Sequence, residues 1–70
     1  MYRLVIDTLE EDSKFLEDLL GRIECEYMIY NNHIYHIDHK NSDYLYDIYT
    51  KVKHLADDFK FKFSIMMMEL

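Results

Sequence analysis

The hydrophobic periodicity of this 70-residue chain changes repeatedly between the spacing of a strand and that of a helix, and the order of these changes restricts the fold. Residues 2–7 are rich in β-forming side chains and alternate, with Tyr2, Leu4 and Ile6 on one face. Successive side chains of a strand point to opposite faces. The pattern therefore predicts a first strand with one buried face.

Apolar side chains at helical spacing follow and predict a helix over about residues 9–20. Thr8 and Glu11 have the spacing of a capping box at its start. Gly21, the only glycine, is the expected C-terminal cap, because glycine readily adopts the left-handed conformation found there. The apolar stripe of this helix consists of Leu9, Phe15, Leu16, Leu19, Leu20 and Ile23.

Two further β-rich segments, residues 25–30 and 34–39, predict a hairpin that turns around Asn31-Asn32. A two-residue turn would mix apolar and polar side chains on both faces. A three-residue loop that includes His33 separates the faces better, and we expect this longer loop. In that register the inward side chains are Cys25, Tyr27, Ile29, Tyr35 and Ile37, and the outward ones are Glu26, Met28, Tyr30, Ile34, His36 and Asp38.

The remaining residues predict a long amphipathic helix and a last strand. Either Asn41 or Ser42 can cap a helix over about residues 43–59. Its apolar stripe is Leu45, Ile48, Val52, Leu55 and Phe59. Residues 61–68 then alternate, which predicts a strand with its inward side chains at Phe61, Phe63, Ile65 and Met67.

The order strand, helix, strand, strand, helix, strand has one economical arrangement within a single α+β domain over residues 1–70. It is a four-stranded antiparallel sheet in which the first and third strands are central and both helices cover one face. The sequence therefore predicts a ferredoxin-like βαββαβ sandwich.

The chain carries a formal net charge of −6, and the excess of acidic residues lies within residues 1–38. A negative field disfavours binding to nucleic acid or to an anionic membrane, because contacts with phosphate groups require Lys or Arg. RNA-binding sheets of this topology also need stacked aromatic side chains on the central strands, where Val5, Ile34 and His36 are expected here. The expected partner is therefore a basic protein surface, with no direct nucleic-acid or membrane binding.

Nothing in the sequence predicts catalysis or a cofactor. A single glycine excludes a glycine-rich phosphate loop, and Cys25 lacks the surrounding turn that a nucleophile needs. A small buried core residue is the favoured interpretation of Cys25. One cysteine cannot form an internal disulfide, and Met1 is not followed by the apolar run of a signal peptide or membrane helix. We therefore expect a non-enzymatic protein of the reducing cytoplasm.

His33, His36, His39 and Asp38 are side chains of the types that bind zinc. Extended geometry separates His33 from His39 by about 20 Å and points His36 to the opposite face. Only His36 and Asp38, joined by Glu26, share a face, and a closed site needs four ligands. The favoured interpretation is an open, solvated sheet face, and the sequence predicts no metal site.

Three groups of side chains are candidates for partner binding. Apolar side chains on an uncovered sheet face often mark an interaction surface. Acidic residues on the first helix, and tyrosines with acidic residues on the second, suit a basic partner. A solvated helix face and tyrosine hydroxyls that simply reach water are the alternative interpretations. The candidates are Met28, Tyr30, Met66 and Met68 on the sheet, Glu10, Glu11, Glu17 and Asp18 on the first helix, and Asp43, Tyr44, Tyr46 and Asp47 on the second.

These features predict a small regulatory or inhibitory protein that binds a basic partner. A nucleic-acid enzyme is one such partner, which carboxylates would occlude by imitating phosphate charge. In size and charge the chain is similar to the small acidic viral proteins that phages make against host enzymes, an analogy without a shared motif. Two alternatives remain open: a homodimer formed through the open sheet face or the edge strands, and a small-ligand or metal-binding protein.

Overall fold

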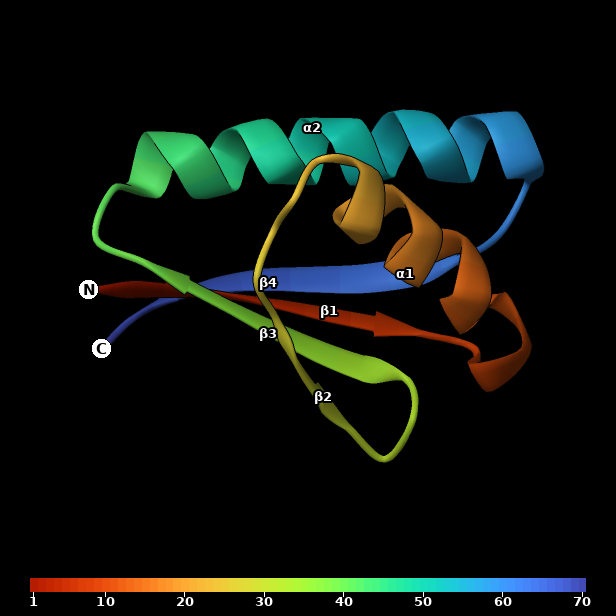
Figure 1. Ribbon diagram of the computed structural model, residues 1–70, viewed down its shortest axis with the longest axis horizontal. Coiled ribbons are helices and arrows are strands. Elements are labelled where there is room, and N and C mark those ends of the chain that lie inside the picture. The colour runs from red at the N-terminus through yellow and green to blue at the C-terminus, as the bar shows by residue number, and fades with distance from the viewer.

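The computed structural model describes residues 1–70, and its central element is a four-stranded antiparallel sheet with the strand order β2-β3-β1-β4 (Figure 1). Strands β1 (Tyr2–Thr8) and β3 (Ile34–His39) are central, whereas β2 (Met28–Tyr30) and β4 (Phe63–Glu69) form the edges. With its two helices, this arrangement confirms the predicted α+β, ferredoxin-like βαββαβ fold.

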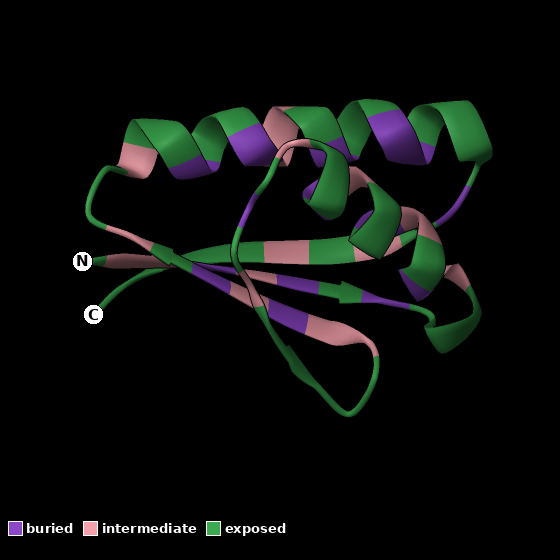
Figure 2. Ribbon diagram, in the orientation of Figure 1, coloured by how far each residue is buried: buried purple, intermediate pink, exposed green.

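Both helices lie on one face of the sheet (Figure 1). A short 3-10 helix, η1 (Glu10–Asp12), continues into α1 (Ser13–Arg22), and α2 (Ser42–Phe59) connects β3 to β4. Figure 2 shows that the outward sides of both helices are exposed. Alternate residues of β1 and β3 are buried against the helices, which confirms the predicted inward faces of these strands. The core consists of Leu4, Ile6, Leu16, Leu20, Cys25, Tyr35, Ile37, Leu45, Ile48 and Val52.

The predicted capping box at the start of the first helix is wrong. Thr8 belongs to β1, where its backbone N–H donates to the carbonyl of His33 at 3.1 Å and its Oγ1 donates to the carbonyl of Leu9. No side chain caps η1 or α1, and Leu9 is exposed outside the helix. Thr8 is therefore held in the sheet and cannot cap a helix. The α-helix begins only at Ser13.

The predicted cap at Gly21 is also wrong, because α1 continues through Gly21 to Arg22. Ile23 packs against the core, and its N–H still donates to the carbonyl of Leu19 at 3.1 Å. The left-handed conformation falls on Glu24 instead, with a φ of 54°. The packing of Ile23 against the core thus extends the helix beyond Gly21, the predicted C-terminal cap.

The hairpin has the longer loop that we expect from the sequence. Tyr30 pairs with Ile34 across a three-residue loop, in which Asn31 and Asn32 have φ values of 53° and 67°. The strand before it is shorter than predicted, since only Met28–Tyr30 pair with β3. Ile29 is 43% exposed although it lies on the helix side, because β2 is a short edge strand.

Helix α2 begins and ends close to the predicted positions. Asn41 is the cap, and its Oδ1 accepts a hydrogen bond from the backbone N–H of Asp43 at 2.9 Å. Beyond Phe59, Lys60 adopts the left-handed conformation with a φ of 59°, and its N–H donates to the carbonyl of Ala56. A lysine therefore occupies the position that favours glycine.

The last strand begins at Phe63, two residues later than predicted. Phe61 is buried outside the strand in a second small cluster with Leu55 and Ala56. Phe15 stacks on Phe59 with ring centroids 4.9 Å apart, although Phe59 is exposed and not part of the buried stripe. These aromatic contacts place the start of α1 beside the end of α2.

Lys60→Gly is expected to stabilise the fold by about 1 kcal/mol, because glycine removes the steric cost of the left-handed conformation. Thermal unfolding should shift upward by about 5 °C. Lys60→Ala is the matched control, since it removes the same charge but keeps Cβ. Equal melting temperatures for the two variants would contradict a left-handed Lys60.

Candidate functional site

The open face of the sheet, opposite the helices, carries a continuous row of side chains across all four strands. The strand registers place Met28 opposite His36, His36 opposite Val5, and Val5 opposite Met66. Met28 and Met66, at the two ends of the row, are 61% and 56% exposed. This row, Met28-His36-Val5-Met66, is called the central row below, and it confirms that the predicted side chains share this face.

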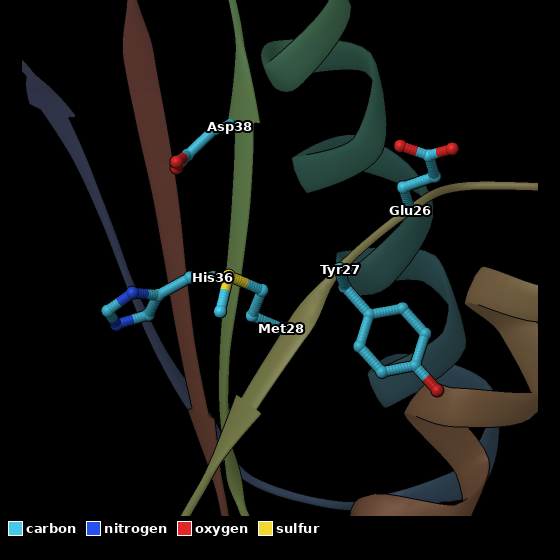
Figure 3. A pocket seen from close by; sticks show the side chains of 5 residues that line it. All are labelled: Glu26, Tyr27, Met28, His36 and Asp38. Carbon is cyan, nitrogen blue, oxygen red and sulfur yellow. The ribbon is translucent and has the colours of Figure 1, made fainter.

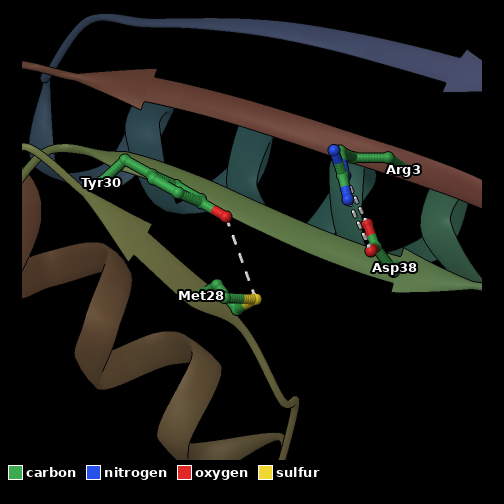
Figure 4. Close-up of polar contacts among 4 residues, drawn as sticks. All are labelled: Arg3, Met28, Tyr30 and Asp38. Carbon is green, nitrogen blue, oxygen red and sulfur yellow. Dashed lines mark hydrogen bonds and ion pairs between the residues drawn. The ribbon is translucent and has the colours of Figure 1, made fainter.

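An ion pair and a hydrogen bond flank the central row, one on each side. The guanidinium of Arg3 donates to both carboxylate oxygens of Asp38, from Nε at 2.7 Å and from Nη2 at 3.0 Å (Figure 4). On the other side, Nδ1 of His33 lies 2.9 Å from Oδ1 of Asp7. The hydrogen bonds from Arg3 hold the pKa of Asp38 below its usual value. Arg3 therefore compensates the charge of Asp38, whereas His33 contacts one oxygen of Asp7.

Tyr30 lies over the end of the central row. Its ring centroid is 4.4 Å from that of His36, and its hydroxyl donates to Sδ of Met28 at 4.0 Å (Figure 4). Nδ1 of His36 is buried and has no hydrogen-bond partner. The single aromatic ring on this face therefore belongs to the short edge strand and covers the histidine, whereas an RNA-binding sheet stacks bases on its central strands.

The three residues considered for a metal, Glu26, His36 and Asp38, line one shallow hollow together with Tyr27 and Met28 (Figure 3). The carboxylate of Glu26 points away from the other two, and that of Asp38 is held by Arg3. No group of three His, Cys, Asp or Glu side chains in the structure could hold a metal ion. The hollow is therefore not built as a metal centre.

Cys25 is buried in the core, as the sequence predicts. Its Sγ donates to the carbonyl of Glu26 at 3.5 Å. Burial raises the pKa of the thiol above its usual value, which favours the neutral form. A neutral, enclosed thiol is a poor nucleophile, so Cys25 acts here as a packing residue.

The acidic candidates of the first helix form a group that we call the α1 acidic group: Glu10 and Glu11 on η1, and Glu17 and Asp18 on α1. All four are exposed. Asp18 lies 3.7 Å from Arg22, whereas none of the ion pairs in the structure involves the three glutamates. Three carboxylates of this group therefore lack a basic partner.

One member of the α1 acidic group is tied to the core. The hydroxyl of buried Tyr35 donates to Oε2 of Glu17 at 2.7 Å and approaches the carbonyl of Ser13 at 3.3 Å. Burial, together with the bond to Glu17, raises the pKa of Tyr35, so the phenol remains a donor. The sheet thus positions the Glu17 carboxylate through a side chain from a different element.

The candidates of the second helix lie on its first half. Tyr46 is 63% exposed, while Tyr44 stacks on His39 with ring centroids 4.2 Å apart. Asp47 pairs with Lys51 at 2.7 Å, and Asp43 forms no ion pair. Partial pairing and stacking leave this surface with less free charge than the α1 acidic group.

The structure separates the predicted partner-binding residues into distinct surfaces. The two helix groups lie on the covered side of the sheet, and the methionines with Tyr30 lie on the opposite side (Figure 1). Met67 lies on the predicted inward face, opposite Leu4, but it is 38% exposed because β4 is an edge strand. No local pattern signals this exposure, since it depends on the position of β4 at the edge of the sheet.

Comparisons of the chain with protein-family models, with curated proteins and with solved structures gave no match. None of the helices is both long and apolar enough to cross a membrane.

Replacing Arg3 by Gln is expected to raise the pKa of Asp38 towards its usual value, because the two hydrogen bonds to the charged carboxylate are lost. NMR titration of the Asp38 carboxyl carbon measures this change. With a depressed folded-state pKa, the stabilisation by the pair is complete above the unfolded-state value of about 3.9 and is lost as the pH falls through the folded-state value. Lys62→Gln, which removes a charge without touching Asp38, should leave that titration unchanged; an equal shift in both variants would contradict the pairing.

Proposed function

We propose that this chain is a non-enzymatic regulatory protein that binds a basic protein surface through the α1 acidic group. The observation that carries this proposal is the set of exposed carboxylates at Glu10, Glu11 and Glu17, none of which has an ion-pair partner. An uncompensated group of like charges accelerates the encounter with a surface of opposite charge.

The helix dipole accounts for only part of this arrangement. Acidic residues in the first turn of a helix stabilise it, which applies to the residues of η1 at the start of the helical segment. The effect falls off within one turn, and Glu17 is the fifth residue of α1. Its carboxylate is instead held by the hydroxyl of Tyr35 from β3, although the residue as a whole is exposed. A partner-facing role explains both parts of the group.

A nucleic-acid enzyme is the partner that we favour within this class. Such enzymes present Lys and Arg to phosphate groups, and the carboxylates of the α1 acidic group would compete for the same side chains. The protein would then inhibit by occupying the nucleic-acid site, as small acidic phage proteins do. The net charge of −6 and the lone reduced cysteine are in keeping with a protein that acts this way in the cytoplasm.

Reversing the charge of the α1 acidic group tests the proposal. The variant combines Glu10→Lys, Glu11→Lys, Glu17→Lys and Asp18→Lys, and its matched control makes the same charge change on α2 at Asp43, Asp47, Asp57 and Asp58. Tagged wild type, variant and control are used to capture proteins from nuclease-treated lysate of the source cells. We expect wild type and control to retain a nucleic-acid enzyme that salt releases and that the variant fails to retain.

The wild-type protein should also inhibit the captured enzyme, and added nucleic acid should compete with it. Glu17→Gln, which keeps a hydrogen-bond acceptor for Tyr35, separates loss of charge from loss of stability. Capture by the α1 variant but not by the α2 control would place the interface on α2 and overturn the assignment to α1.

A further inference from the structure

Strand β4 is an open sheet edge that lacks the usual protection against pairing. It has seven residues and no proline, and its only charged residue is Glu69 at the end. Natural edges are commonly shortened, charged or bulged to prevent contact with another chain. The opposite edge, β2, is shortened to three residues. The β2 edge is thus protected because it is short. The β4 edge is long, and only its last residue is charged.

The hydrogen bonds of the sheet show which groups of β4 point outward. Leu70 donates its N–H to the carbonyl of Met1, the residue opposite to it in the register between β1 and β4, at 2.9 Å. In an antiparallel ladder, alternate residues bond to the same neighbouring strand. Even-numbered residues of β4 therefore bond to β1. The outward N–H and C=O groups belong to Phe63, Ile65, Met67 and Glu69.

Apolar side chains surround this edge on both faces of the sheet. Met66 and Met68 are exposed on the open face. On the helix side, Met67 is 38% exposed and lies at a hollow of about 180 Å³ between α2 and β4. The hollow has only apolar lining residues: Leu4, Tyr46, Tyr49, Ile65, Met66 and Met67. Exposure of so many apolar side chains to water costs free energy, which burial against another chain would recover.

We propose that β4 pairs in antiparallel orientation with β4 of a second copy of this chain, about a two-fold axis at Met66. In this register Ile65 lies opposite Met67 of the second copy, and Phe63 lies opposite its Glu69. All four outward residues of each strand are then hydrogen-bonded. A shift by two residues in either direction leaves at least one of them outside the ladder.

The charges at the ends of the strand favour a second copy in this orientation. Lys60 and Lys62 precede β4, and Glu69 ends it. Antiparallel pairing brings the basic end of each strand to the acidic end of the other, whereas parallel pairing would bring like charges together. The two-fold relation repeats this complementarity at both ends, and such isologous dimers are the commonest symmetric assemblies.

The size of the edge predicts a weak dimer. Seven residues span about 24 Å, and the molecule is 23 Å across its intermediate axis. The side of the molecule along β4 therefore has an area of roughly 500 Å². In a standard interface each partner buries about 800 Å². We therefore expect a dissociation constant in the micromolar range. The interface does not include the α1 acidic group, so it is independent of the proposed function.

A charge exchange at position 66 tests this register, because Met66 is the only residue opposite itself. Met66→Glu and Met66→Lys should each sediment as a monomer at about 0.5 mM, where the wild type sediments at twice the 8.7 kDa of one chain. An equimolar mixture of the two variants should restore the dimer. A monomeric wild type at this concentration, or a mixture that stays monomeric while the wild type dimerises, would overturn the proposal.

Cysteine cross-linking provides a second test that does not introduce charge. Residues of a non-hydrogen-bonded antiparallel pair have Cα atoms about 4.5 Å apart, within the range of a disulfide. Met66→Cys should therefore form a disulfide-linked dimer on mild oxidation. Ser64→Cys, whose counterpart would lie about 14 Å away along the strand, should not. Equal cross-linking of both variants would rule out the register, and no cross-linking of Met66→Cys would rule out the two-fold axis.

Discussion

The helices of this protein cover only one face of its sheet, and most of its surface chemistry depends on that constraint. Two helices and four strands form two layers, so alternate residues of β1 and β3 are either buried in the core or exposed on the open face. Leu4, Ile6, Tyr35 and Ile37 supply the buried set. The other set, which includes the half-buried Val5 and His36, faces the open side of the sheet, where no helix covers it. Any exposed apolar group on that face is consequently available to a partner.

The two sides of the molecule differ in how their charges are compensated. On the open face, Arg3 and His33 occupy the carboxylates of Asp38 and Asp7. On the helix side, the glutamates of the α1 acidic group have no ion-pair partner, although Glu17 accepts a hydrogen bond from Tyr35. The open face therefore suits contacts that exclude water, and the first helix suits a partner of opposite charge.

The sheet is also asymmetric at its edges, for a reason that lies in the connections. The three-residue hairpin loop and the turn after α1 leave only Met28–Tyr30 to pair with β3. The long helix α2 instead leads the chain to a position where β4 lies along the full length of β1, so seven residues pair. Only the second edge is long enough to serve as a template for another strand. The inferred dimer and the proposed acidic interface can therefore exist on one molecule at the same time.

The sequence by itself determined the order of the elements, the inward faces of the strands, the three-residue loop and the limits of α2. These features depend on spacings of two, three or four residues within one segment, such as the alternation of Leu4 and Ile6. The structure then selected Asn41 over Ser42 as the cap of α2. Tertiary structure decided the limits of the first helix, because the sheet retained Thr8 and core packing extended the turns to Ile23. It also decided the bond between Arg3 and Asp38, the central row and the outward groups of β4. Those features join residues that are distant in the chain, and their pairing follows from the register between strands, which no local pattern contains.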